Sequence, residues 1–186
     1  MEKQDISKQT RFYRKMHKWL AVPMFFVMFV IGFSGLLLGW KKQTALLPKT
    51  QKGATENSAD WIKIDSLVLI ARSYSKNNLK KEDEIDRIDI RPQKGIAKIV
   101  FAQHFTELQL DCKTGEILSV STRKSDFIEK IHDGSIVDYF VKTSSDQFKL
   151  FYTTAASLSL ILLSFSGFWL WYNPIRIKKR KKKFEI

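Results

Sequence analysis

Three histidines are the residues of this sequence best suited to metal or redox chemistry. They are His17, His104 and His132, and imidazole nitrogen is a good ligand for iron. His17 immediately precedes one long apolar segment, and His132 lies on the N-terminal side of another. We take these two as candidate ligands of a cofactor or metal; the alternative is that each is a polar residue at a membrane edge. His104 lies in a predicted sheet, and we expect it at the surface.

The sequence lacks the motifs of several other chemistries. It has no G-x-G-x-x-G or phosphate-binding loop, so any electrons come from another protein or from a quinone. It has no H-E-x-x-H and no paired-cysteine spacing for zinc, and no nucleophile in a recognisable triad context. The single cysteine, Cys112, lies in the turn sequence Asp-Cys-Lys-Thr-Gly. We expect it to be exposed, either as a free thiol or in an intermolecular disulfide.

Two long apolar segments must position the histidines. Residues 20–38 and 150–173 contain no charged side chain. Nineteen residues of helix cover about 28 Å, close to the thickness of a membrane's hydrocarbon. Tryptophan and tyrosine rings, which prefer the headgroup level, flank both segments. The sequence therefore predicts transmembrane helices at 19–40 and 150–172, with Pro174 ending the second.

The basic residues are concentrated outside these helices, at both ends of the chain. Residues 1–18 carry six Lys/Arg and two acids, a net charge of +4, and residues 173–186 carry seven and one, a net charge of +6. This distribution favours anionic lipids over nucleic acid as the charged partner. By the positive-inside rule, both ends are cytoplasmic tails and the segment between the helices is periplasmic. We expect the first helix to remain as an uncleaved anchor.

Small residues predict where these helices approach other helices, because they let backbones come close in lipid. They lie in both helices: Gly32, Gly35, Gly39, Ser166 and Gly167. In an antiparallel pair, His17 would share a membrane face with Ser166-Gly167, and His132 with Ser34-Gly35. Each pair of small residues leaves a gap of the kind that a flat macrocycle needs. The packing partner is either the other helix or a second copy of the chain.

The segment between the helices changes pattern three times. Residues 41–58 are polar and irregular, which predicts a linker. Residues 59–122 predict an amphipathic helix, capped by Asp60, and then four short strands in an antiparallel meander. Residues 123–149 predict an amphipathic connector, part of which lies on the membrane surface. The fold class is an α-helical membrane protein with two transmembrane helices and an inserted small α+β domain.

Several stretches resemble the PepSY-associated transmembrane helix proteins of bacterial inner membranes. Arg14-Lys15-Met16-His17-Lys18-Trp19-Leu20 resembles the family's entry into its first helix, and Ser34-Gly35-Leu36 its Thr-Gly near the helix end. The stretch from Glu107 to Ile117 resembles the strand–turn–strand of a PepSY module. Ile131-His132-Asp133-Gly134 and Ser166-Gly167-Phe168-Trp169-Leu170-Trp171 resemble the late His-x-Gly and the Leu-Trp exit.

The sequence also departs from that family in a few places. Serine replaces threonine before Gly35 and Gly167, and Ala21 stands where glycine is usual. Larger members have four spans, whereas two are predicted here. Because of this last difference, the activity of the larger members does not transfer directly to this chain.

The resemblance implies an inner-membrane protein of iron acquisition. Larger members reduce iron–siderophore complexes with haem b held by histidines, so His17 and His132 are the expected haem ligands here. The hydrocarbon separates the two by about 30 Å. Each haem would therefore need a second ligand from a homodimer or from an iron-uptake or reductase partner.

Two main functions remain open from the sequence. The first is a haem-binding redox accessory in iron and siderophore acquisition, an electron-transfer subunit rather than a complete enzyme. PepSY modules elsewhere are associated with peptidase inhibition or regulation. The second function is therefore a non-catalytic periplasmic binding or peptidase-regulating module anchored in the membrane. A purely structural subunit is the third.

Overall fold

The computed structural model describes residues 2–142 and 145–184. They form two compact units. One holds the two long helices and comprises the chain up to Leu36 and from Lys130 onward. The other, which we call the inserted domain, is Leu37–Glu129. This architecture confirms the predicted fold class of two membrane helices with a small α+β insertion.

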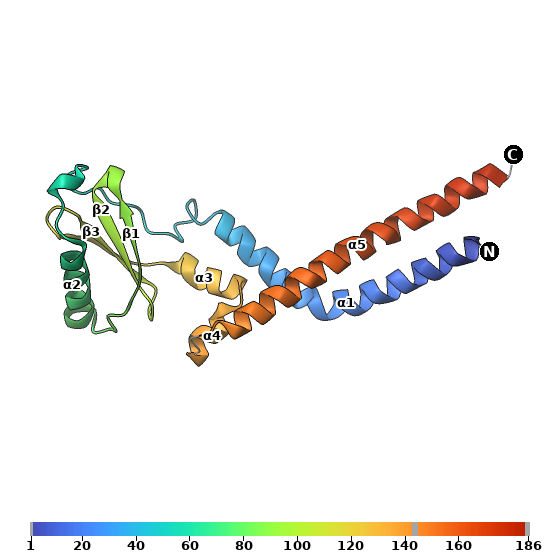
Figure 1. Cartoon of the computed structure of the whole chain (residues 1–186), viewed down its shortest axis with the longest axis horizontal. Coiled ribbons are helices and arrows are strands. Elements are labelled where there is room, and N and C mark those ends of the chain that lie inside the picture. Colours follow the sequence, from blue (N-terminus) through green and yellow to red (C-terminus); the bar gives the residue numbers. More distant parts are fainter. Residues whose placement is uncertain (1, 143–144, 185–186) are drawn as a thin grey trace. The chain divides into compact units, whose positions relative to one another are not determined.

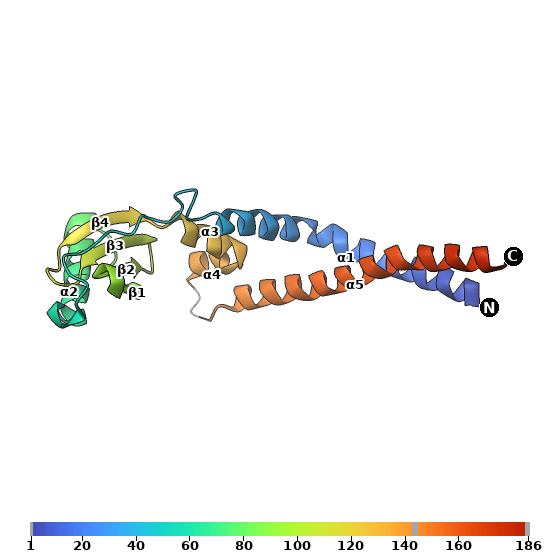
Figure 2. The same ribbon diagram turned by 90° about the horizontal axis from the view of Figure 1, so that it is seen from above.

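Two helices of 38 residues each, α1 (Glu2–Gly39) and α5 (Gln147–Phe184), make up most of the first unit. They run antiparallel, and the N and C termini lie at the same end of the pair (Figures 1 and 2). Both are long and apolar enough to cross a membrane. Their large apolar side chains face outward, and Trp19, Phe26 and Phe151 are each more than 70% exposed. Such exposure is unfavourable in water and suits surrounding lipid.

Both helices extend beyond the predicted spans. Residues 2–18, expected as a tail, continue α1, and α5 runs on to Phe184. The prediction that Pro174 ends the second helix is therefore wrong. A proline removes one backbone hydrogen bond, and the residues after it are mostly lysine and arginine, which are good helix formers. The side chains of Arg180–Lys183 lie outside the described part, so their contact with lipid stays a prediction.

The buried positions of the helix pair, among the side chains that the structure describes, are small or polar. They are Ser34 on α1 and Ala156, Ser159, Ser166 and Asn173 on α5. The α5 positions are three or seven residues apart, which places them on one face of the helix. Small side chains at this face follow the packing rule for helices in lipid, where no hydrophobic force drives helices together.

Two short helices, α3 (Lys124–His132) and α4 (Ser135–Val141), form the predicted connector. The turn between them is built by Asp133 and Gly134. The Asp133 carboxylate accepts hydrogen bonds from Ser135 and pairs with Lys149 of α5 at 3.0 Å. Gly134 has φ +80°, and a Cβ there would lie 2.7 Å from the ring of Tyr152. Glycine is required at this close approach.

The inserted domain contains an antiparallel meander of four strands in the order β1-β2-β3-β4 (Figure 2). The strands are β1 (Ile85–Arg91), β2 (Ile96–Phe101), β3 (Thr106–Asp111) and β4 (Ile117–Thr122). Helix α2 (Ile64–Tyr74) covers one face of this sheet. Leu67 and Ala71 of α2 pack there on alternate residues of β2 and β3, including Ile99 and Leu108. The predicted strands and helix are confirmed.

The start of α2 differs from the sequence prediction. Asp60 does not cap this helix, because it closes a separate short 3₁₀ turn, Ser58–Asp60, which Asn57 caps. The N-cap position of α2 is Lys63, whose side chain makes no capping hydrogen bond. Packing of Leu67 and Ala71 against the sheet therefore holds the helix without that cap.

Cys112 is buried, at 1% exposure, and the expectation that it is exposed is wrong. The turn lies where it was predicted, and the carboxylate of Asp111 accepts hydrogen bonds from the amides of Lys113 and Thr114. Cys112 itself donates through its amide to Gly95 and accepts from Ile62. Its side chain joins the core under α2, and burial raises the pKa of the thiol. A buried, protonated thiol is a poor nucleophile, so its labelling reports opening of the domain.

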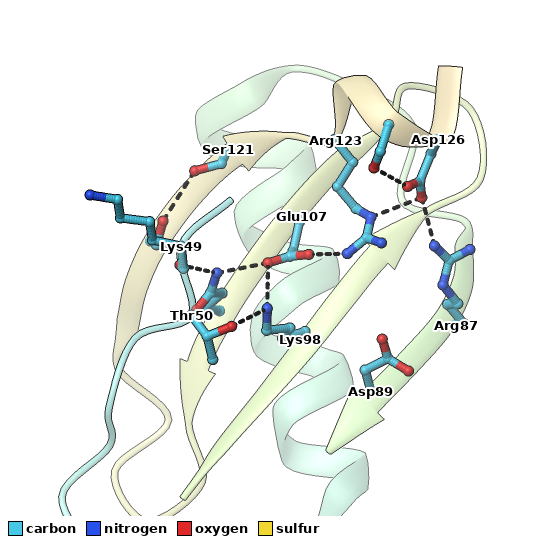
Figure 3. Close-up of polar contacts among 12 residues, drawn as sticks. Lys49, Thr50, Arg87, Asp89, Lys98, Glu107, Ser121, Arg123 and Asp126 are labelled. Atoms are coloured by element: carbon cyan, nitrogen blue, oxygen red, sulfur yellow. Dashed lines mark hydrogen bonds and ion pairs between the residues drawn. The ribbon is translucent and has the colours of Figure 1, made fainter. Parts of the chain in front are cut away.

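The predicted linker packs on the second face of the sheet. Residues 47–55, which we call the strap, run along the polar side of β2 and β3 (Figure 3). Gln109 donates to the carbonyl of Lys49 and accepts from the amide of Gln51, and Asp111 accepts from Ala54. Both faces of β2 and β3 are therefore buried. This second covering layer was not predicted from the sequence.

Replacing Gly95 by alanine is expected to detach the strap. Gly95 has φ +62°, and a Cβ there would lie 1.8 Å from the carbonyl oxygen of Thr55 in the strap. Gly95→Ala should lower the free energy of unfolding of the inserted domain by about 3 kcal/mol or more, because strain and a backbone clash add. The rate at which a thiol reagent labels Cys112 in the detergent-solubilised chain measures this.

The matched control is Gln93→Ala, an exposed position in the same turn. It should leave the labelling rate of Cys112 unchanged. If the labelling rates of both variants match that of the unmodified chain, the strap contributes nothing to the domain.

Candidate functional site

The structure places His17 of α1 against Ser166 and Gly167 of α5. His17 Nδ1 lies 2.8 Å from Ser166 Oγ. A Cβ on Gly167 would lie 3.7 Å from His17 Cε1, so the imidazole edge lies over the glycine. Ser166 is fully buried and His17 is half-buried. The histidine and the two small residues, 149 positions apart in sequence, form one site.

The same arrangement is found at the other end of the helix pair. His132, the last residue of α3, places Nδ1 2.9 Å from Ser34 Oγ. A Cβ on Gly35 would lie 3.3 Å from His132 Cε1. Each histidine therefore meets a Ser-Gly pair on a long helix, and each pair follows a phenylalanine in the sequence. The two sites are related by the antiparallel course of the helices.

The serine hydroxyls determine the tautomer of both rings. Ser34 Oγ lies 2.5 Å from the carbonyl of Val30, and Ser166 Oγ lies 2.7 Å from that of Leu162. Oxygens this close require the hydroxyl hydrogen between them. A hydroxyl has one hydrogen, so each serine oxygen accepts from the histidine Nδ1–H. The lone pair of a neutral ring is then on Nε2, which makes no hydrogen bond within residues 2–142 and 145–184.

This donor geometry is the one that metal-bound histidines use. A ligating histidine commonly donates its second ring N–H to a neighbouring acceptor, which fixes the tautomer and the ring orientation. Each site supplies a single such nitrogen. His17 and Ser34 are seventeen residues apart on α1, or about 26 Å, so the two histidines cannot share an iron. The described residues contain no group of three or more His, Cys, Asp or Glu that would hold a metal ion.

Polar and aromatic contacts continue from His17 toward the chain ends. Tyr13 stacks on Trp169 with ring centroids 6.0 Å apart, and Asn173 Nδ2 donates to Thr10 Oγ1 at 3.1 Å. Asn173 is fully buried, and its side-chain oxygen has no partner among the described residues. Contacts between α1 and α5 therefore stabilise the interface both at His17 and between His17 and the chain ends.

The remaining predicted packing glycines lie elsewhere. A Cβ on Gly32 or Gly39 would have no neighbour within 4 Å among the described residues, so neither glycine packs closely against another helix in that part of the chain. Their role in packing against a second copy stays a prediction. His104 lies in the turn between β2 and β3, where it is half-buried, stacks on Phe101 and hydrogen-bonds Thr106.

A network of charges under the strap was missed by the sequence analysis. Glu107 on β3 is fully buried between Lys98 on β2, at 3.5 Å, and Arg123, which contacts its other oxygen (Figure 3). Arg123 also reaches Asp126 at 2.8 Å, and Arg87 reaches the same carboxylate at 2.6 Å. Lys98 and Glu107 alternate with apolar residues along their strands, a pattern that is typical of a sheet with one solvated face. That face is buried because the strap packs on it.

The ionised state of Asp126 depends on its two arginines. Burial works against ionisation, but hydrogen bonds from Arg123, Ser125 and Arg87 outweigh it and hold the pKa of Asp126 below its ordinary value. A carboxylate with a lowered folded pKa stabilises the fold above its unfolded pKa, near 4. That contribution is lost as the pH falls through the folded pKa.

The chain is a membrane protein with two apolar spanning helices and an inserted α+β domain. A model of one protein family, the PepSY-associated TM region, matches residues 14–185. The chain therefore belongs to that family, as its sequence motifs suggested. Searches among curated proteins and among solved structures found no match.

Removing the charge of Glu107 is expected to destabilise the inserted domain. Glu107→Gln leaves two buried cations without their shared counter-charge, which should cost about 3 kcal/mol. The opening equilibrium would rise about a hundredfold, and labelling of Cys112 would accelerate in proportion. Asp89→Asn, a partly exposed acid on β1, is the control and should change labelling less than about twofold. Equal effects of the two variants would contradict a structural role for the network.

Proposed function

We propose that this protein is a haem-binding redox accessory in iron and siderophore acquisition, with His17 and His132 as iron ligands at two separate sites. The observation that carries the proposal is the pair of Nδ1–H···Oγ hydrogen bonds. They leave each Nε2 lone pair available at opposite ends of the helix pair. Haem b, when bound, would accept and pass on single electrons.

The chain's own residues fit this group. Ser34 and Ser166 hold the two rings in the ligating tautomer and fix their orientation. Gly35 and Gly167 lack a side chain beside the imidazoles. Each site offers one ligand, so we expect the second to come from another copy of the chain or from an iron-uptake or reductase partner.

The proposed location is the bacterial inner membrane, with both termini cytoplasmic and the inserted domain periplasmic. The basic segments at both chain ends support this orientation. Anionic lipids are the proposed partners of these segments. A cavity of about 680 Å³ on the surface of α1 suits a lipid headgroup and is lined by Arg11, Arg14, Lys15, Lys18, Trp19, Val22 and Pro23.

The alternative is a non-catalytic binding or peptidase-regulating module presented by the membrane anchor. The inserted domain uses its buried charges and its one histidine, His104, in contacts that stabilise the fold. This favours a non-catalytic role for the domain. Under this alternative, the histidines of the helix pair are interfacial polar residues.

Haem content of the purified protein is expected to follow the two histidines. The chain produced in haem-sufficient cells and purified in mild detergent should show a haem absorption spectrum. His17→Ala and His132→Ala should each remove about half of the haem per chain, and the double variant all of it, because the sites are separate. Absorbance of the haem band relative to protein measures this.

His104→Ala is the matched control and should retain full haem content. A haem-free native chain that takes up none on reconstitution would remove the redox proposal. Iron acquisition that survives the double variant would favour the binding module.

An impermeant thiol reagent is expected to reveal the orientation. Native Cys112 is buried and provides the blank. In spheroplasts, a cysteine introduced at exposed Arg72 of α2 should be labelled, because the inserted domain faces outward. One introduced at exposed Lys8 of α1 should be labelled only after permeabilisation. The reverse pattern would place the inserted domain in the cytoplasm.

A further inference from the structure

A cation-lined cavity of about 760 Å³ lies in the inserted domain, between the strap and the end of β1. Its volume is in the range of small-molecule sites. Six of its lining residues are cationic: Lys42, Lys49, Arg91, Lys94, Lys98 and Arg123. The one acid in the lining is Asp89. Such an excess of one sign at a concave surface focuses the field on a ligand of the opposite sign.

Neighbouring acids do not cancel this charge. Glu107 is shared by Lys98 and Arg123, and Asp126 by Arg123 and Arg87. Arg87 also pairs with Asp86 at 2.6 Å. Counting Glu107, Asp126, Asp86 and Arg87 with the lining residues leaves a net charge of +3. Asp89 approaches Arg91 only to 3.8 Å.

Asp111 lies beside the β1–β2 turn, where its carboxylate accepts backbone hydrogen bonds from Ala54, Lys113 and Thr114. Three further acids lie at the opposite end of β1. Glu82, Asp83 and Glu84 precede Ile85, whereas the cavity lies beside Asp89–Lys94. The seven residues of β1 extend over about 20 Å, which is more than a Debye length at physiological salt. The cavity therefore keeps its positive potential.

One cation of the cavity is buried and held in place, whereas three others are exposed. Lys98 is 8% exposed in its side chain and donates to Thr50 at 2.9 Å, so its position is set by the strap (Figure 3). Lys42, Lys49 and Lys94 are exposed and have no ion pair within the described residues. They come from the strap side and from the β1–β2 turn. A ligand between these walls would meet cations from both.

We propose that this cavity binds a multivalent oxyanion, a ligand that carries two or more phosphate or carboxylate charges. Arginine and lysine recognise both groups through charge-assisted hydrogen bonds, and a monovalent anion would leave most of the cations unpaired. The oxyanion comes either from a soluble solute or from an anionic lipid headgroup. Lys42 follows the last residue of α1 by three positions, which brings the second source within reach. This site is separate from the histidine sites and needs no haem.

Titration calorimetry on the full chain in neutral detergent tests the proposal, with pyrophosphate, citrate and acetate as probes. Pyrophosphate or citrate should bind with one site per chain, and acetate should not. Arg91→Gln combined with Lys94→Gln should weaken binding about tenfold, through loss of charge-assisted hydrogen bonds. Arg72→Gln combined with Lys113→Gln removes the same charge from exposed positions outside the cavity and should leave affinity within about twofold.

Cys112 labelling confirms that each variant is folded. Absence of binding by both multivalent probes, or equal weakening in the two double variants, would overturn the proposal, because the effect would then come from net charge alone. Nanodiscs distinguish the two sources. If phosphatidylglycerol at 0.15 M salt abolishes pyrophosphate binding that phosphatidylcholine permits, the headgroup occupies the site. If binding is equal in both, the ligand is a soluble anion.

Discussion

The lack of hydrogen-bonding partners in hydrocarbon is the constraint on which the helix pair depends. Every polar group placed there must find its partner within the protein. Ser34 and Ser166 meet this requirement with their own helix backbone, and their oxygens then accept from His132 and His17. One rule thus holds the helices together and orients the two imidazoles. Close approach of the two backbones explains why most buried positions of the pair that the structure describes are serine or alanine and none is leucine.

In the inserted domain, buried charges likewise need partners within the protein. Burying Glu107 without a counter-charge would be costly, and Lys98 and Arg123 supply it. The strap completes the arrangement, because it removes water from that face and provides Thr50 and the carbonyl of Lys49 as partners. The cavity at the edge of this network is positively charged because the acids of the network do not neutralise all of its lysines and arginines.

The two proposals assign different tasks to the two units. The helix pair would hold haem at both membrane faces, whereas the inserted domain would bind an anion on its own surface. Electron transfer needs ligands held in one orientation, which the serine contacts supply. Anion binding tolerates flexible lysines, since a charge field and not a rigid geometry carries most of the attraction. Failure of one proposal would leave the other intact.

Much of this fold could be predicted from local pattern. Unbroken apolar stretches indicated both membrane helices, alternation indicated four strands, and the order of motifs indicated the family. His17 and His132 were recognised because they lie beside apolar segments. Tertiary structure alone decided that Ser166 meets His17 across 149 residues, that Gln109 binds the strap and that Cys112 turns inward. The physical reason is that the spacing and polarity of residues determine whether one segment forms a helix or a strand and whether it leaves water. Which distant segments pair depends instead on which of their faces meet in the folded chain.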